Sequence, residues 1–288
     1  MHRYTEESTT NVPLTAGGCL EVESFNGSIE ITGRDGETAE VRATKYAEEQ
    51  QLLDEIKVEV THGPGGVRVR GIRPEGLRGN MGVSFVLTVP REVSLENIHS
   101  SNGSLHVRNI AGGGHLKTSN GSVHIADFEG DIDAGTSDGS IHVSNLQGAA
   151  LLRTSNGTVQ ASGVRGSFEA TTTNGTIRAE IVEVPAGRAI VAKTSNGVID
   201  LALGALRADV LAKTTNGNVV VRLPDGTGAH LSAKTSNASI SSDFEVTSGS
   251  RSKSHLEGTV GRGGPRIDVQ SSNGPIRIVR HEGAAREF

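Results

Sequence analysis

Large aromatic side chains are scarce in this chain of 288 residues. Aromatic residues make up 3% of it, and there is no Trp. A globule packed around large side chains is therefore not expected, because aromatic residues dominate the cores of such proteins. Glycine, in contrast, occurs 38 times. Small and β-branched residues with frequent glycine turns favour a fold whose core is a narrow stack.

Cysteine and long apolar runs are also nearly absent. Cys19 is the only cysteine, which excludes an intramolecular disulfide and a zinc site built from several cysteines. No apolar run approaches the roughly 18 residues of a membrane span. Residues 1–18 lack the apolar stretch of a signal peptide, although Ala16-Gly17-Gly18 before Cys19 superficially resembles a lipoprotein cleavage site. We therefore expect no membrane span here. Either the protein stays in the cytoplasm, or the chain has lost a leader or an anchor, and the sequence does not choose between the two.

Charge and motifs exclude further classes. The net charge of −5 argues against a general nucleic-acid binder, whose domain is normally strongly basic. The sequence has no glycine-rich phosphate loop, no nucleophile elbow and no His-Glu metal helix. We therefore expect neither a nucleic-acid partner nor a cofactor.

The strongest positive signal is the dipeptide Asn-Gly, or a near variant, which recurs along the chain. Four successive steps of the recurrence are 18 residues each. The corner positions are Asn102, Asn120, Asp138, Asn156, Asn174, Asn196, Asn216, Asn237 and Asn273, with an outlying copy at Asn26. Gly follows in every copy except at Ala238. A fixed period of about 20 residues indicates a repeat architecture.

Within one repeat, apolar and polar residues alternate, which predicts strands with one buried face. The predicted inward residues of three successive repeats are Leu116, Thr118, Val123, Ile125, Phe128, Ile132, Ala134, Thr136, Ile141, Val143, Leu146, Leu152, Thr154, Val159, Ala161 and Val164. At the corner, Asn-Gly is expected to supply the positive φ of a tight turn.

Asn-Gly linkers ordinarily suggest hairpins. A meander of hairpins, however, does not place the same inward side chain and the same corner every 18 residues, whereas stacked coils require it. We therefore predict an all-β fold, a single-stranded parallel β-helix (β-solenoid). It is expected to be right-handed, with about 18–22 residues per coil and a rise of about 4.8 Å.

The repeats divide the chain into a strand-rich N-terminal cap (1–100), regular coils (101–280) and a tail (281–288). Within the cap, strands are predicted at 37–45, 57–60, 67–69 and 83–89, and a short helix at 48–56. The 36 residues from Asn237 to Asn273 fit two periods whose middle corner is lost, with a loop at 248–254. Such caps protect the exposed strand edges of a solenoid.

The chain also resembles a bacterial family of β-strand-repeat proteins known as putative adhesins, of unknown function. The motifs that carry the resemblance are Leu20-Glu21-Val22 before Asn26-Gly27-Ser28-Ile29, Val41-Arg42-Ala43-Thr44-Lys45, Phe85-Val86-Leu87-Thr88-Val89-Pro90, and Ser272-Asn273-Gly274-Pro275-Ile276-Arg277-Ile278. The resemblance implies a β-helical domain of envelope-associated or stress-linked proteins, with no established catalytic residues. It suggests the cell envelope or the exterior as the location.

Three columns of side chains are candidates for function. The corner asparagines are expected to form an internal ladder of amide hydrogen bonds, which Asp138 interrupts. Outward at the fourth position after the corner stand His106, His124 and His142, which are candidates for a shared divalent metal or merely a solvated strand face. Three residues before the corner, the basic stripe Lys117, Arg153, Lys193, Lys213 and Lys234 either binds a polyanion or serves solubility.

Two further features point to structure rather than catalysis. The hydroxyl residues directly before the corner (Ser119, Ser137, Ser155, Thr173, Ser195 and Thr215) are expected to make contacts along the stack. Asp127, Asp131, Asp133 and Asp138 concentrate acidic groups, and Asp131 and Asp133 are predicted to face outward together. Glycan-cleaving β-helices need paired carboxylates or a calcium cluster. Lys117 is the nearest base, one coil away, so no catalytic residue is predicted.

These features predict a non-enzymatic interaction or structural module, adhesin-like or envelope-associated, that presents ladders of side chains to a glycan or a protein. One alternative is a scaffold that assembles end to end through imperfectly capped edges. The second alternative is a polysaccharide-processing enzyme.

Overall fold

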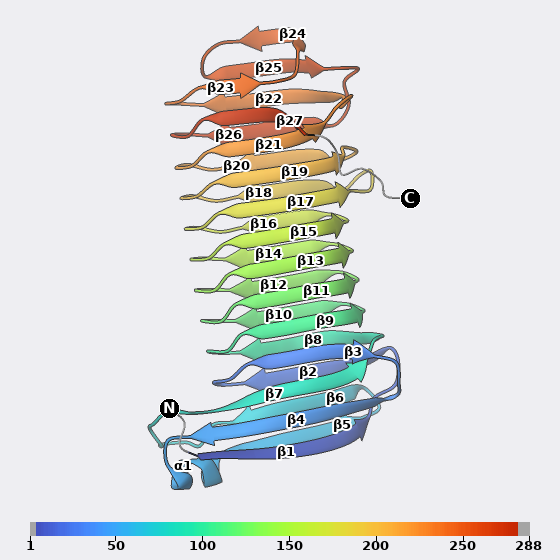
Figure 1. Cartoon of the computed structure of the whole chain (residues 1–288), viewed down its shortest axis with the longest axis vertical. Coiled ribbons are helices and arrows are strands. Elements are labelled where there is room, and N and C mark those ends of the chain that lie inside the picture. The colour runs from blue at the N-terminus through green and yellow to red at the C-terminus, as the bar shows by residue number, and fades with distance from the viewer. Residues whose placement is uncertain (1–3, 282–288) are drawn as a thin grey trace. The chain divides into compact units, whose positions relative to one another are not determined.

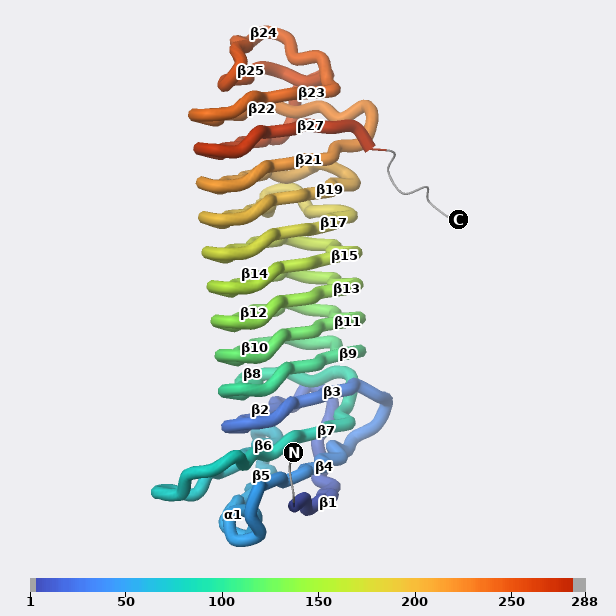
Figure 2. Tube along the Cα trace, turned by 60° about the vertical axis from the view of Figure 1, so that its left-hand side comes forward, coloured from blue at the N-terminus to red at the C-terminus, as the bar shows by residue number. Residues whose placement is uncertain are grey.

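The computed structural model of the chain describes residues 4–281. In this range the chain consists of β-strands and one short helix (Figure 1, Figure 2). It divides into two compact units, Met1–His142 (unit 1) and Val143–Phe288 (unit 2). Strand β13 (Ile141–Gln147) crosses the division.

Unit 1 contains the helix and the first twelve strands. Their bounds are β1 (Tyr4–Pro13), β2 (Gly18–Ser24), β3 (Ile29–Arg34), β4 (Thr38–Ala47), α1 (Gln50–Glu55), β5 (Lys57–Gly63), β6 (Gly66–Ile72), β7 (Met81–Pro90), β8 (Val93–Ser100), β9 (Leu105–Ala111), β10 (Gly114–Thr118), β11 (Val123–Glu129) and β12 (Ile132–Thr136).

The strands of unit 1 form two sheets, with the orders β1-β4-β7-β3-β9-β11 and β12-β10-β8-β2-β6-β5. Pairing is parallel from β3 to β11 and from β2 to β12. Each turn of the chain thus adds one strand to each sheet, which confirms the predicted stacked coils. In Figure 1, β3, β9 and β11 run from left to right on the near side as the chain climbs, so these coils are right-handed.

The first coil of the chain lies between two later ones. Strand β3 pairs with both β7 and β9, and β2 pairs with both β6 and β8. The outlying Asn26 is therefore a neighbour of Asn102: the Asn102 Nδ2 donates to the Asn26 Oδ1 at 2.5 Å across 76 residues of sequence.

The elements expected in the cap are present as β4, α1, β5, β6 and β7. They include the antiparallel pairs β4–β7 and β5–β6, which depart from the coil pattern. Strand β1 was not predicted. It is an edge strand whose residues are exposed except for Val12, so it lacks the alternation that marks a half-buried strand.

Unit 2 contains the remaining strands. Their bounds are β14 (Ala150–Thr154), β15 (Val159–Arg165), β16 (Phe168–Thr171), β17 (Ile177–Glu183), β18 (Ala189–Lys193), β19 (Ile199–Ala205), β20 (Asp209–Lys213), β21 (Val219–Pro224), β22 (Ala229–Thr235), β23 (Ile240–Ser242), β24 (Val246–Arg251), β25 (His255–Val260), β26 (Arg266–Ser271) and β27 (Ile276–His281).

The last coil of unit 2 is inserted between earlier ones. One sheet has the order β15-β17-β19-β21-β27-β23, and the other has the order β24-β25-β22-β26-β20-β18-β16-β14. Strands β26 and β27 return between coils that precede them in the sequence, and each pairs with them in parallel.

The interpretation of the segment from Asn237 to Asn273 as two periods with a lost middle corner was wrong. Residues 246–260 instead form the antiparallel strands β24 and β25, which close one sheet. Most of the loop expected at 248–254 belongs to β24, which ends at Arg251. Of the expected tail 281–288, His281 ends β27, and the remainder lies outside the described residues.

The core of each unit is the column of inward side chains. All the inward residues predicted from the three repeats are buried, and Leu116, Val123 and Phe128 are completely inaccessible to solvent. Burying a side chain such as Val or Leu contributes about 1.5–3 kcal/mol. The same contribution recurs on each coil. Many small buried side chains therefore stabilise the fold in place of a core of large aromatic residues, which the composition excludes.

The glycine of the corner has a different role from the expected one. Gly103, Gly121 and Gly139 do not have a left-handed φ. A β-carbon on Gly121 would instead lie 2.0 Å from the carbonyl oxygen of Gly103 in the preceding coil. The positive φ values occur at the opposite bend, for example at Asn109 (57°) and Asp127 (52°), residue types that tolerate this conformation. Close approach of neighbouring coils, rather than turn geometry, therefore requires glycine at the corner.

Candidate functional site

A buried column of hydroxyl groups ties each corner to the preceding coil. The Thr118 Oγ1 donates to the Gly103 carbonyl at 2.8 Å, and the Thr136 Oγ1 donates to the Gly121 carbonyl at 2.8 Å. In unit 2 the Thr194 Oγ1 donates in the same way to the Gly175 carbonyl at 3.0 Å. The hydroxyl contacts that were expected of the next residue along the chain are made one position earlier. The residue at the earlier position is the buried one, and a buried hydroxyl needs a hydrogen-bond partner.

The corner asparagines form chains of amide hydrogen bonds on the surface. In unit 1 the Asn120 Nδ2 donates to the Asn102 Oδ1 at 2.5 Å. In unit 2 the amides bond in the order Asn156, Asn174, Asn196, Asn216, Asn273 and Asn237, with Nδ2–Oδ1 distances of 2.6–2.9 Å. These side chains are exposed, so the ladder of amide bonds lies on the surface and not inside the stack, where it was expected. Asp138 is also exposed, and its backbone N–H donates to the Ser119 carbonyl at 2.9 Å.

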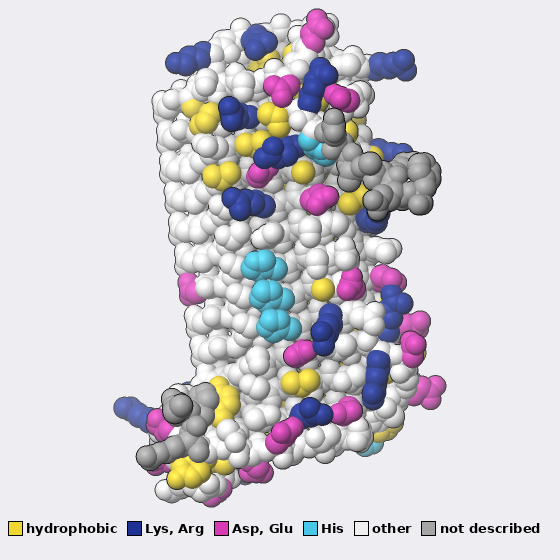
Figure 3. All heavy atoms as spheres, in the orientation of Figure 1, with side chains coloured by type: hydrophobic (Ala, Val, Ile, Leu, Met, Phe, Trp, Pro, Cys, Tyr) yellow, Lys and Arg dark blue, Asp and Glu magenta, His cyan; other side chains and the backbone are white. Residues whose placement is uncertain are grey.

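The three histidines of unit 1 are stacked face to face on β9, β11 and β13. The ring centroids of His106 and His124 are 4.7 Å apart, and those of His124 and His142 are 4.9 Å apart. The ring planes differ by 1° and 4°. The stack is the cyan column in Figure 3. Parallel rings direct their nitrogen lone pairs side by side rather than towards one point.

This stack does not form the metal site that the sequence suggested. Among residues 4–281, no group of three or more His, Cys, Asp or Glu side chains is placed to hold a metal ion. Burial lowers the pKa of His124, and the neighbouring imidazoles lower it further because protons on adjacent rings repel each other. The structure therefore favours the neutral form of His124 at neutral pH.

The basic stripe is broken into parts. In unit 1, Lys117 lies between His99 and Gly135 on the neighbouring strands. In unit 2, Arg153 pairs with Thr171. Lys193 and Lys213 are direct neighbours on β18 and β20.

The order of the basic residues across the sheet differs from their order in the sequence. Gln270 on the inserted strand β26 separates Lys213 from Lys234. A cluster of Lys193, Lys213 and Lys234 thus remains in unit 2.

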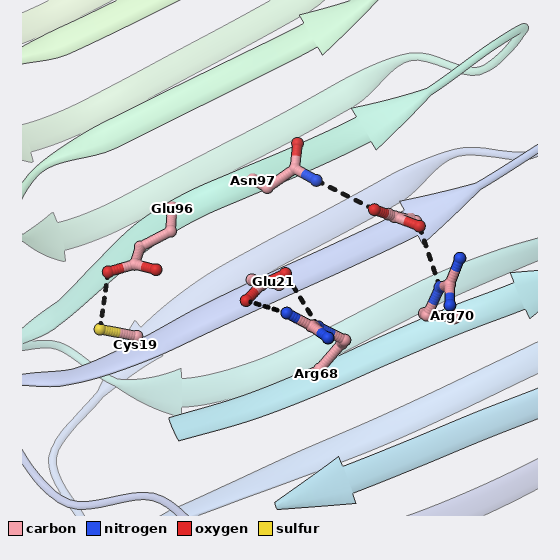
Figure 4. Close-up of polar contacts among 7 residues, drawn as sticks. Cys19, Glu21, Arg68, Arg70, Glu96 and Asn97 are labelled. Atoms are coloured by element: carbon pink, nitrogen blue, oxygen red, sulfur yellow. Dashed lines mark hydrogen bonds and ion pairs between the residues drawn. The ribbon is translucent and has the colours of Figure 1, made fainter. Parts of the chain in front are cut away.

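A polar cluster that sequence analysis missed lies on β2, β6 and β8 of unit 1 (Figure 4). The Arg68 guanidinium donates to both carboxylate oxygens of Glu21, at 2.8 and 2.9 Å. Arg70 and Asn97 both donate to Glu23, each at 3.0 Å. The Arg68 guanidinium lowers the pKa of Glu21. No local motif could reveal these pairs, because each one joins segments at least 47 residues apart.

Cys19 belongs to the same cluster and lines a hollow of about 550 Å³ beside the β5–β6 turn. Its Sγ donates to the Glu96 Oε1 at 3.0 Å. This hydrogen bond raises the pKa of the Cys19 thiol, with smaller contributions from burial and from the carboxylates of Glu96 and Glu21. A protonated thiol is a poorer nucleophile than a thiolate, so this shift lowers the reactivity of Cys19.

Asp131 and Asp133 flank the buried Ile132, as the alternation predicted. Asp133 is partnered across the sheet by His115, whose Nδ1 lies 3.5 Å from the Asp133 Oδ2. Lys117, the nearest base named from the sequence, lies one coil away and is opposite Gly135.

Comparison with known proteins agrees with the coil architecture. The family described as Toastrack DUF4097 matches residues 57–279. The chain belongs to this family. The match covers most of the described coils, so the resemblance stated from the sequence is confirmed at the level of a putative-adhesin-like domain of unknown function. No curated protein matches this Toastrack chain.

Solved structures to which the chain is similar carry adhesin or binding-protein names. A putative adhesin from Bacteroides fragilis is 14% identical with a TM-score of 0.42, over 96% of this chain and 97% of that one. A putative adhesin from Parabacteroides distasonis is 14% identical with a TM-score of 0.38, over 95% and 97%. A putative lipid binding protein from the same organism is 13% identical with a TM-score of 0.36, over 95% and 96%. Likeness this low transfers no ligand to this chain.

Within residues 4–281, no helix has the length and apolar character needed to cross a bilayer.

Proposed function

We propose that this Toastrack chain is a non-enzymatic interaction module of the bacterial envelope that binds a polymer or protein through ladders of side chains. The observation that carries the proposal is the in-register stacking of outward residues. The histidine rings at 4.7 and 4.9 Å are its clearest example. A repetitive partner such as a glycan meets the same side chain on several coils, so that weak contacts add up through multivalency.

Binding to the envelope of the source cells tests this proposal. The purified chain is mixed with isolated wall glycan and with isolated membrane, and its co-sedimentation with each is measured. Saturable co-sedimentation that a soluble polymer from the same fraction competes away is the expected result. A chain that stays in the supernatant with both fractions contradicts the proposal.

The same incubation tests the enzymatic alternative. A binding module leaves the polymer intact, so no soluble fragments should accumulate over time. Fragment release that disappears in the double variant Asp131→Asn/Asp133→Asn would replace the module by a polysaccharide-processing enzyme. These carboxylates are the relevant ones because glycan hydrolysis requires a carboxylate pair.

End-to-end assembly is a second candidate function, and strand β1 favours it. This ten-residue strand lies at the edge of its sheet, and only Val12 is buried. A long free edge can pair with another chain. Against this, Glu6 and Glu7 carry charge on that edge and pair with Lys45 and Arg42. Light scattering over a wide concentration range decides the matter: a rising mass supports assembly, and a constant monomer mass excludes it.

A further inference from the structure

One sheet of unit 2 is hollowed where its strands approach the row of asparagine corners. The hollow has a volume of about 540 Å³ and is lined by residues of β20, β26 and β22 and by the start of β25. Its volume lies within the range of about 300–1,000 Å³ that is typical of ligand sites. The inserted strand β26 lies between β20 and β22 along this hollow.

Two lysines define the charge of this hollow. Lys213 and Lys234 stand on either side of Gln270, so their backbones are two strand spacings apart, or ~9.6 Å. Lys193 follows one strand beyond Lys213. Within residues 4–281 these lysines form no ion pair with a carboxylate. Their ammonium groups are therefore available to an external anion.

The nearby acidic groups are already engaged. The Asp268 carboxylate accepts hydrogen bonds from Gln270 at 3.1 Å and from Arg266 at 3.3 Å. The Glu257 carboxylate lies 3.3 Å from the Nε2 of His255. Neither carboxylate neutralises the two lysines.

Six of the seven hydroxyl residues of the lining fall into two sets. The buried members Thr214, Thr235 and Ser271 donate to glycine carbonyls at 3.0–3.1 Å and are structural. The outer members Thr215, Ser236 and Ser272 make no side-chain hydrogen bond in the described part of the chain. A free hydroxyl both donates and accepts, as the hydroxyls of a sugar require.

We propose that this hollow binds the acidic groups of an anionic polysaccharide, with Lys213 and Lys234 holding successive carboxylates or sulfates and the outer hydroxyls holding the sugar. This rests on the proposed interaction function and names its partner class. The lysines are separated along the stack, so a polymer with repeated charges fits them better than a single small anion. The lining contains no Phe, Tyr or Trp side chain, which disfavours single-stranded nucleic acid because its bases bind mainly by stacking on such rings.

Direct binding to defined polymers tests this assignment. Calorimetry with the full chain compares an oligogalacturonate, a dextran sulfate, neutral dextran and a single-stranded DNA, each at low and at high salt. Saturable binding of an acidic glycan that weakens with salt is expected, with no binding of neutral dextran. The carboxylated and sulfated polymers identify which acidic group is preferred. Tighter binding of the DNA than of either acidic glycan overturns the assignment.

Variants distinguish binding in this hollow from attraction by the surface charge of the chain in general. Lys213→Ser/Lys234→Ser should weaken glycan binding about tenfold, because each exposed ion pair contributes up to about 1 kcal/mol. The matched control Lys57→Ser/Arg78→Ser makes the same charge change at exposed basic residues of unit 1 outside the stripe and should change affinity less than twofold. An equal loss in both double variants overturns the proposal.

The outer hydroxyls give a readout that is independent of charge. The variant Ser236→Ala/Ser272→Ala should weaken binding severalfold at constant net charge, and unchanged affinity contradicts the role given to the hydroxyls. Circular dichroism checks that each variant is folded. If the hollow variants still bind the envelope like the wild type, this inference fails while the interaction function stands. If the wild-type chain binds neither envelope nor polymer, both fail.

Discussion

Replacing Gly121 with alanine tests whether the approach of neighbouring coils dictates the corner. The added β-carbon would lie 2.0 Å from the Gly103 carbonyl oxygen, 2.4 Å from its carbon and 2.8 Å from the Ser104 nitrogen. All three neighbours are backbone atoms, so no flexible side chain can move aside. The two coils must therefore separate locally.

The expected cost follows from the contacts that such a separation disturbs. Overpacking in a well-packed region typically costs about 1–3 kcal/mol. The Gly103 carbonyl also accepts the hydrogen bond of the buried Thr118 hydroxyl at 2.8 Å, and weakening it adds about 1 kcal/mol. We expect Gly121→Ala to lower the free energy of unfolding by about 3 kcal/mol.

Gly113→Ala is the matched control. The nearest atom to its added β-carbon is the Ser94 Oγ at 3.8 Å, and Gly113 does not have a left-handed φ. This substitution should leave stability unchanged or raise it by up to about 1 kcal/mol, because alanine restricts the unfolded chain. Guanidinium unfolding followed by far-UV circular dichroism compares both variants with the wild type. Equal stability of the two alanine variants would refute the reasoning.

Three further predictions concern the pKa shifts and the buried hydroxyls. The lowered pKa of His124 means that the unfolded chain binds its proton more readily, so stability should be full above about pH 6.5 and should fall as the pH drops through the lower folded pKa. Unfolding at pH 7.5 and pH 5 measures this. The thiol of Cys19 should be alkylated faster at pH 8 in Glu96→Gln than in the wild type, because losing the carboxylate lowers the thiol pKa. Thr194→Val should cost about 1–2 kcal/mol of unfolding free energy by leaving the Gly175 carbonyl without its hydrogen bond.

Each of these predictions has a control. His124→Gln should reduce the acid-induced loss of stability, and an unchanged pH profile contradicts the assignment to His124. For Cys19, equal alkylation rates in Glu96→Gln and the wild type would show that the hydrogen bond does not govern the thiol. Thr194→Ser keeps the hydroxyl and should retain more stability than Thr194→Val, so the opposite order would exclude the hydrogen bond as the cause.

The coils could be predicted because their pattern is local. Alternation along residues 115–132 identified Leu116, Val123 and Phe128 as buried, since successive residues of a strand point to opposite faces. The same period placed His106, His124 and His142 on adjacent strands. Their use could not be predicted, because the direction of the ring planes depends on packing and not on spacing.

The features that could not be predicted from the sequence are formed by residues that lie far apart in it. The partners of Cys19 and Glu21 lie on strands that the sequence does not link to β2. The outer hydroxyls of the hollow lie close to Lys213 and Lys234 only because β26 returns beside these lysines. Periodicity carries no information about such returns.

By itself, the sequence determined the class of fold, the inward residues and the repeated corner, because strand alternation and an 18-residue period are properties of neighbouring residues. Only the tertiary structure decided the order of the coils at each end, the reason for glycine at the corner, and the hollow beside the inserted strand. Every parallel edge of a coil offers nearly the same backbone hydrogen bonds and the same corner to the next coil. The pairing of Asn26 with Asn102, or of Asn273 between Asn216 and Asn237, is therefore selected by long-range packing that no local pattern records.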